Sequence, residues 1–220
     1  MAVENFTTYT EVDLNSKLTV ISDRITWASQ DRLEDGYVYK DKGVAFFGGD
    51  FTHYLTLKVT ALPAVDTYLG SPWYMSNDID YPYSLITGGK TALALLIARS
   101  GSSSLYKLYI DQIIGGSLHN DPFNGVATLV KNIIYYLTIY RDESVGTYGR
   151  FYCDIYTDAA RAGTPTSLYL DITNEKTDFR YIFGQGSYGL PTTSYLWSGY
   201  VENLSLTALP RVYSQAQIIG

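Results

Sequence analysis

The clearest pattern along the chain is the alternation of apolar and polar positions with a period of two residues. In residues 51–60 (FTHYLTLKVT), Leu55, Leu57 and Val59 fall on one side of an extended chain and threonine, tyrosine and lysine on the other. Because successive side chains of a strand point to opposite faces, this pattern predicts a strand with one buried face. His53 falls on the buried side, where we expect a partly buried, hydrogen-bonded histidine.

Similar short apolar runs recur along the chain, separated by Gly, Asn, Asp, Ser and Pro. Strands alternating with tight turns give such a sequence. The expected strands are two within residues 17–27, then 37–39, 91–99, 105–110, 133–140, 151–156, 167–172, 179–183 and 197–206. Residues 141–149 are expected to join two of them in a hairpin. The predicted core comprises Leu55, Leu57, Val59, Leu137, Ile139, Phe151, Ile155, Val201 and Leu204.

Composition points the same way, since the 220 residues include 22 Tyr and 19 Gly, and only 17% are charged. Aromatic residues favour strands and glycine favours turns, and no long helical stripe is present. No internal repeat or linker interrupts the series of strands. We therefore expect one β-sandwich domain over residues 1–209, followed by a C-terminal tail over residues 210–220.

Charge and hydropathy exclude some partners from this picture. The formal charge of −6 and the absence of a Lys/Arg cluster argue against nucleic acid, because phosphate binding depends on clustered cations. Residues 1–10 show no secretory signal, and no apolar run approaches the length of a membrane span. Cys153, the one cysteine, is expected to be a small buried side chain.

Three segments resemble the concanavalin A-like and laminin G-like lectin–glucanase superfamily. Residues 135–142 (YYLTIYRD) with 151–154 (FYCD) are similar to its central hairpin, although Ile134 stands where the family usually has Trp. Residues 197–206 (WSGYVENLSL) look like its closing strand, with a bulge between Val201 and Leu204. Residues 49–59 resemble an early core strand. The resemblance implies an all-β fold, a two-sheet antiparallel jelly-roll sandwich.

A second resemblance concerns short stretches of sequence and not the fold. Residues 5–13, 37–43 and 156–161 are similar to uncharacterised open reading frames of phage and environmental sequence collections. This likeness implies a viral setting, with the protein in the virion or in the host cytoplasm during assembly.

Catalytic signatures are missing from the sequence. Glycosidases of the superfamily place two Glu around an Asp on one strand, whereas the six Glu of this chain are scattered. His53 and His119 have no nucleophile signature around them, and no phosphate-binding glycine loop is present. We therefore expect a protein that is not an enzyme.

The most suggestive surface candidate is the segment 71–83 (SPWYMSNDIDYPY). Aromatic faces pack on sugars while amides and carboxylates bind hydroxyls, so the segment suits a glycan, and protein interfaces use the same residues. The other interpretation is that the aromatics only cover one end of the sandwich. The loop 184–195 extends the patch if the two segments meet. The candidate ligand-binding residues are Trp73, Tyr74, Asn77, Asp78, Tyr81, Tyr83, Tyr188 and Tyr195.

The acidic part of this segment has two interpretations. Asp78 and Asp80, with Asn77 beside them, offer the oxygen ligands that Ca²⁺ prefers. The same residue types also form turns by bonding their own backbone. No other cofactor is expected.

Our leading hypothesis is a noncatalytic, lectin-like virion structural or decoration protein that assembles with virion proteins or with itself as a homo-oligomer. The alternative is a carbohydrate-binding module that recognises a glycan through exposed Trp and Tyr. If Trp73 and Tyr74 are exposed, replacing both with alanine should leave stability nearly unchanged.

Overall fold

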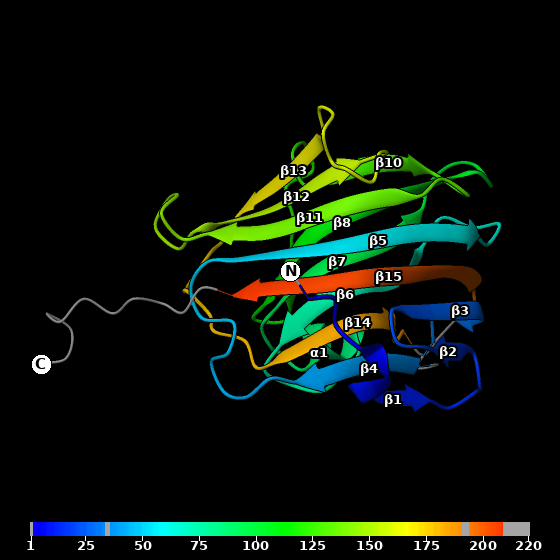
Figure 1. The fold of residues 1–220 in the computed structure, drawn as a ribbon, viewed down its shortest axis with the longest axis horizontal. Coiled ribbons are helices and arrows are strands. Elements are labelled where there is room, and N and C mark those ends of the chain that lie inside the picture. Colours follow the sequence, from blue (N-terminus) through cyan, green and yellow to red (C-terminus); the bar gives the residue numbers. More distant parts are fainter. Residues whose placement is uncertain (1, 34–35, 191–193, 209–220) are drawn as a thin grey trace, which may run out of the picture.

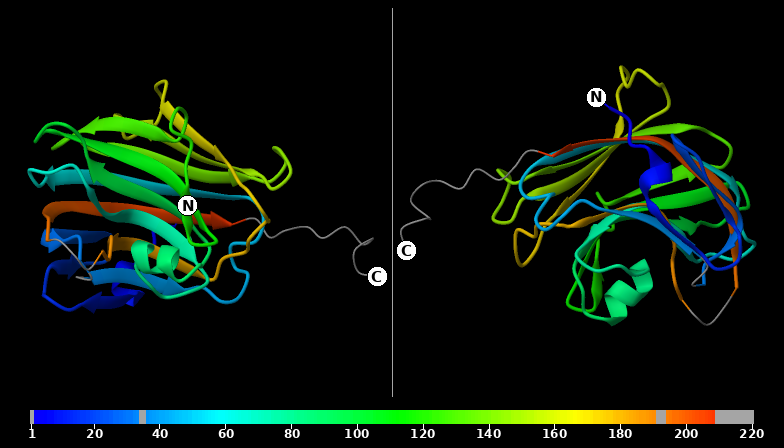
Figure 2. Two further views of the ribbon diagram at one scale, coloured as in Figure 1. Left: turned by 180° about the vertical axis from the view of Figure 1, so that it is seen from behind. Right: turned by 60° about the horizontal axis from the view of Figure 1, so that its bottom comes forward.

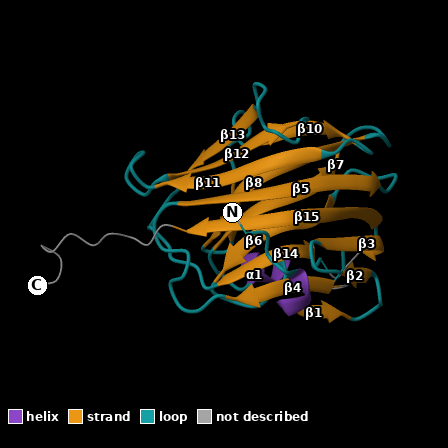
Figure 3. Ribbon diagram, in the orientation of Figure 1, coloured by secondary structure: helices purple, strands orange, loops and turns teal. Residues whose placement is uncertain are grey.

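The computed structural model describes residues 2–33, 36–190 and 194–208. In this part of the chain nearly all regular structure is β-strand (Figure 3). The exceptions are a short 3-10 turn η1 (Phe6–Thr8) and a six-residue helix α1 (Pro82–Thr87). The expected boundary between domain and tail, at 209/210, lies outside the described residues.

Two antiparallel sheets pack face to face (Figure 1). Sheet A contains seven described strands and forms the large sheet at the front of Figure 1. In spatial order these strands are β13 (Thr166–Asp171), β12 (Arg150–Tyr156), β11 (Tyr135–Asp142), β5 (Phe51–Ala61), β15 (Leu196–Ala208), β3 (Arg24–Asp31) and β2 (Leu18–Val20).

Sheet B lies behind sheet A and contains eight described strands. Its main path is β1 (Thr10–Asp13), β4 (Gly36–Asp41), β14 (Tyr181–Ser187), β6 (Tyr68–Ser76), β7 (Ala92–Arg99), β8 (Leu105–Ile114) and β10 (Val126–Val130), with β9 (Ser117–His119) paired to β8. Sequentially distant strands are neighbours in both sheets, as in a jelly roll. The predicted two-sheet jelly-roll sandwich is therefore confirmed.

The core between the sheets contains every residue predicted for it. Leu137 pairs with Leu55 on β5 and with Ile155 on β12, so the inward positions of the three strands form one continuous row. The nine predicted residues are at most 4% exposed. Cys153 is also fully buried, as expected. Alternation therefore identified the inner face of sheet A correctly.

His53 departs from the expectation. It is fully buried, and neither ring nitrogen has a hydrogen-bond partner among the described residues. Phe47, Phe51 and Trp73 surround the imidazole, with ring centroids 4.7–5.6 Å away. Burial, reinforced by Lys42 and Arg141, lowers the pKa of His53 to about 3. The ring is thus a neutral member of the aromatic core.

Strand β6 is the largest correction to the predicted elements. Residues 71–76 were expected to be surface loop, but they are the last six of the nine residues of β6, which lies between β14 and β7 in sheet B. Eight of the nine residues of β6 are buried, because one face meets the core and the other meets a second apolar cluster. A strand buried on both faces has no polar–apolar alternation, and the register shift between Gly70 and Trp73 accommodates Pro72.

The second apolar cluster lies on the outer face of sheet B and includes Tyr74, Phe183, Tyr188 and Leu85. Leu85 belongs to α1, which lies in front of sheet B when the molecule is viewed from behind (Figure 2). No helix in the described ranges is long and apolar enough to cross a bilayer.

Candidate functional site

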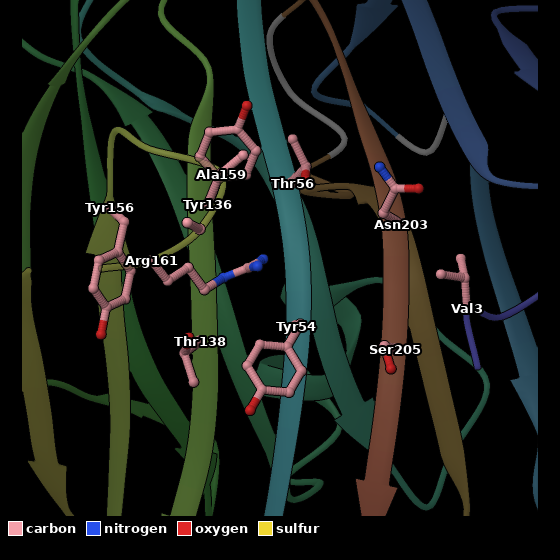
Figure 4. A pocket seen from close by; sticks show the side chains of 11 residues that line it. Val3, Tyr54, Thr56, Tyr136, Thr138, Tyr156, Ala159, Arg161, Asn203 and Ser205 are labelled. Atoms are coloured by element: carbon pink, nitrogen blue, oxygen red, sulfur yellow. The ribbon is translucent and has the colours of Figure 1, made fainter. Parts of the chain in front are cut away.

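A hollow lies on the outer face of sheet A (Figure 4). It has a volume of about 710 Å³ and crosses strands β15, β5, β11 and β12. We call it the sheet A groove. Its lining residues are Val3, Tyr54, Thr56, Tyr136, Thr138, Tyr156, Ala159, Ala160, Arg161, Asn203 and Ser205.

The floor of the sheet A groove follows from the same alternation that builds the core. Tyr136 on β11 lies opposite Thr56 on β5 and opposite Tyr156 on β12, while Thr138 lies opposite Tyr54. Their sequence neighbours point inward, so these side chains must point outward. The register thus brings three tyrosines and two threonines from three strands to one patch.

One wall of the groove is the loop that follows β12. The Asp158 carboxylate accepts a hydrogen bond from the Ala162 backbone N–H at 3.2 Å, and the Asp158 carbonyl accepts one from the Arg161 N–H at 3.2 Å. Arg161 has a φ of 52°, in the left-handed region that non-glycine residues seldom adopt. This local fold turns the Arg161 side chain back over the sheet.

Arg161 reaches across β11 toward β5, with the rings of Tyr54 and Tyr136 on either side (Figure 4). Its guanidinium carbon lies 5.1 Å from the Tyr54 ring centroid and 5.7 Å from that of Tyr136, so both contacts are cation–π interactions. Arg161 forms no ion pair in the described part of the chain, and its Nε has no hydrogen-bond partner there. Partial burial lowers the pKa of Arg161, and the nearby Tyr54 partly offsets this lowering. The groove therefore presents a cation with unused donors.

The opposite wall comes from β15 and the N-terminal segment. The register between β15 and β5 shifts between Glu202 and Ser205, which confirms the predicted bulge. Asn203 occupies the bulge with a φ of 57°, and its backbone N–H donates to the Asp23 carbonyl at 2.8 Å. The exposed Asn203 amide and the Ser205 hydroxyl add polar groups beside the rings.

The structure does not place the predicted aromatic patch on the surface. Trp73 and Tyr74 are both fully buried, on opposite faces of β6. Trp73 lies in the core against Phe151, and Tyr74 stacks on Phe183 with ring centroids 3.9 Å apart. Both residues belong to a central strand, so the expectation of exposed anchors is wrong.

The remaining aromatic candidates do meet, but as packed neighbours. Tyr188 is 6% exposed, and its ring lies 5.7 Å from that of the partly buried Tyr83. Tyr81 is also 6% exposed and packs edge-on against Tyr37. Tyr195 is partly buried and packs against the core. The two Tyr-containing segments, whose contact the sequence left open, do meet, mostly beneath the surface.

The polar candidates of segment 77–80 serve the local fold. The Asn77 amide donates to the Asp178 carbonyl at 2.8 Å and accepts from the Arg180 N–H. Asp78 forms an ion pair with Lys90 at 3.0 Å, and Asp80 accepts from the Tyr81 N–H. Within the described ranges no group of three or more His, Cys, Asp or Glu is arranged to hold a metal ion. The Asp80 carboxylate thus bonds its local backbone, whereas the Asp78 carboxylate forms an ion pair with Lys90.

Sequence reasoning missed the residues of the sheet A groove. Tyr54, Tyr136 and Tyr156 were visible as tyrosines at outward strand positions, and this signal identifies an aromatic surface. Arg161 carried no comparable signal, because its place over the rings depends on the path of its loop.

No family model and no curated protein sequence matches this chain. Solved structures do match. An alginate lyase, Aly36B, with bound alginate trisaccharide has a TM-score of 0.58 at 12% identity, covering 93% of this chain and 89% of its own. An alginate lyase from Aplysia kurodai has a TM-score of 0.56 at 10% identity, covering 93% and 92%. The VIP36 exoplasmic/lumenal domain, in a Ca²⁺- and Man3GlcNAc-bound form, has a TM-score of 0.55 at 10% identity, covering 96% and 88%.

These similarities establish the class of fold, a jelly-roll sandwich shared by lectin-like domains and polysaccharide lyases. They are consistent with the concanavalin A-like resemblance. They also overturn one expectation: because several neighbours are alginate lyases, the prediction that this protein is not an enzyme is contradicted. The expected phage setting, virion partners and homo-oligomer find no support among them.

Proposed function

We propose that this protein binds an acidic polysaccharide in the sheet A groove. The observation that carries the proposal is Arg161, a cation with unused donors held over the rings of Tyr54 and Tyr136. Sugar C–H faces pack on aromatic rings, and a guanidinium binds a carboxylate through paired hydrogen bonds. A uronic acid offers both groups on one sugar.

The structural neighbours support this choice of ligand. Aly36B has been solved with alginate oligosaccharides, and alginate is a polymer of uronic acids. In the groove, the uronate carboxylate would meet Arg161, the sugar ring would pack on Tyr54 or Tyr136, and its hydroxyls would meet Thr56, Thr138 and Asn203.

The test is the affinity of a short alginate oligosaccharide for the protein and for Arg161→Gln, measured by isothermal titration calorimetry. The variant should bind about tenfold to a hundredfold more weakly, because a hydrogen bond to a charged group contributes about 1.5–3 kcal/mol. Added salt should weaken the wild type more than the variant.

Arg180→Gln is the matched control. Arg180 also lies over a tyrosine ring, 5.0 Å from the centroid of Tyr181, but it neighbours strand β14 of sheet B. It pairs with Asp41, and its loss changes the net charge by the same amount. Equal weakening by the two variants, or wild-type binding to a neutral oligosaccharide with the same affinity, would contradict the proposal.

Polysaccharide cleavage is the second candidate function, favoured by the tyrosine hydroxyls beside Arg161. In a lyase reaction a base removes the proton next to the uronate carboxylate, the glycosidic C–O bond breaks, a C=C bond forms, and the leaving oxygen takes up a proton. A guanidinium on the carboxylate stabilises the developing negative charge, and a tyrosine can exchange the proton. Burial and the nearby Asp154 raise the pKa of Tyr156, which disfavours its phenol as the base. Ultraviolet absorbance of the unsaturated product distinguishes cleavage from binding alone.

A further inference from the structure

Three more tyrosines lie side by side on the outer face of sheet A, beside the groove. Tyr140 and Tyr152 have ring centroids 4.5 Å apart and planes only 6° from parallel. Tyr169 follows with its centroid 6.4 Å from that of Tyr152. We call these three residues the tyrosine ladder; each of them is partly exposed.

Strand register fixes the ladder relative to the groove. Tyr140 pairs with Tyr152, which pairs with Tyr169, whereas Tyr136 of the groove pairs with Tyr156. Tyr136 and Tyr140 are four residues apart on β11, a distance of about 13 Å along a strand. The ladder is therefore a second aromatic row that crosses the same face parallel to the groove.

On β11, β12 and β13 the outward positions between the Tyr136–Tyr156 pair and the ladder are polar. Thr138 pairs with Asp154, which pairs with Ser167, and all three side chains share the outward face. The Ser167 hydroxyl donates to Asp154 at 2.6 Å. At the far side of the ladder, Arg150 lies 4.6 Å from the Tyr169 ring centroid and pairs with Asp171 at 2.6 Å. The strip thus consists of two hydroxyls and the Asp154 carboxylate, all of which can accept hydrogen bonds from the hydroxyls of a polysaccharide.

Tyrosines paired on adjacent strands also stabilise a sheet through their cross-strand contacts. That role accounts for the contact between Tyr140 and Tyr152. It does not account for a row that continues over three strands, stays partly exposed, and adjoins a groove containing Arg161.

We propose that the tyrosine ladder is a second subsite for the polysaccharide bound in the sheet A groove. This inference rests on the proposed function. A chain that leaves the groove along the strands crosses the polar strip and packs on the ladder. The protein therefore prefers oligosaccharides long enough to reach both rows over those that fill the groove alone.

The experiment compares alginate oligosaccharides of increasing length, from the trisaccharide upward, on the wild type and on Tyr152→Ala. Tyr152 is the chosen position because it contacts both other rings of the ladder. The wild type should gain affinity once a chain reaches the ladder. Tyr152→Ala should lose roughly tenfold for the long chains, since an aromatic contact contributes about 1.5 kcal/mol, and little for the trisaccharide.

Tyr200→Ala is the matched control, because Tyr200 lies on β15 of the same sheet, against Arg24 rather than in either aromatic row. It should leave both affinities unchanged. If Tyr152→Ala unfolds, Tyr169→Ala on the edge strand β13 removes one end of the ladder instead.

The two proposals fail differently. A wild type that binds no trisaccharide overturns the proposed function. A wild type that binds trisaccharide through Arg161 but gains nothing from longer chains overturns the ladder alone. Retention of the long-chain preference in the ladder variant, or its loss in Tyr200→Ala, also contradicts the second subsite.

Discussion

Replacing Trp73 with alanine is expected to lower the free energy of unfolding by about 3–5 kcal/mol. The indole is fully buried between the sheets. Its ring lies 5.7 Å from Phe151 and 5.6 Å from His53, so truncation leaves a cavity inside an aromatic cluster. Since domains are commonly stable by about 5–15 kcal/mol, this loss is a large share of the total.

Urea unfolding followed by circular dichroism measures the effect. Phe123→Ala is the control, because Phe123 is 89% exposed and its loss should change stability by less than about 0.5 kcal/mol. A Trp73→Ala protein as stable as this control would mean that Trp73 is exposed in solution, as the sequence had suggested.

Asp111→Asn is expected to stabilise the protein at alkaline pH. Asp111 is fully buried on the outer face of sheet B, where Oδ1 accepts from the Asn120 amide at 3.1 Å and Oδ2 has no partner among the described residues. Burial raises the pKa of Asp111 from 3.8 to about 7, and the bond from Asn120 opposes this rise. The folded protein thus holds a proton that the unfolded chain has already lost.

The pH window follows from the two pKa values. Below pH 4 the carboxyl is protonated in both states, so its ionisation does not affect stability. As the pH rises from about 4 to 7, the unfolded state ionises while the folded state resists, and stability falls. The full loss is on the order of 4 kcal/mol, because each tenfold difference in proton affinity is about 1.4 kcal/mol.

Unfolding free energies of the wild type and Asp111→Asn, measured between pH 4 and pH 8, test this result. The two proteins should agree at the acidic end, and the variant should be the more stable one above neutrality. Asp171→Asn is a control, because Asp171 is exposed and paired with Arg150. A gap that is constant over the whole pH range would show that Asp111 does not titrate in this window.

The sequence by itself determined the inner face of sheet A. On β5, β11 and β12 one face is apolar and the other polar, so a period of two residues is enough to assign both. The buried Leu137 follows from this contrast. The bulge in β15 follows from the broken alternation between Val201 and Leu204, and the hairpin from β11 to β12 follows from the Asp, Ser and Gly of residues 141–149. The alternation also placed Tyr54, Tyr136 and Tyr156 on the outward face.

Only the tertiary structure decided how these positions combine. Strand β6 is buried on both faces, so its sequence does not alternate between apolar and polar residues. Without that alternation its sequence resembles that of an aromatic loop. The sheet A groove depends on the strand register and on the left-handed backbone at Arg161. The burial of His53 depends on which aromatic rings pack around it. Local pattern gives the face of each strand, whereas neighbours distant in sequence are set by packing, which no single segment encodes.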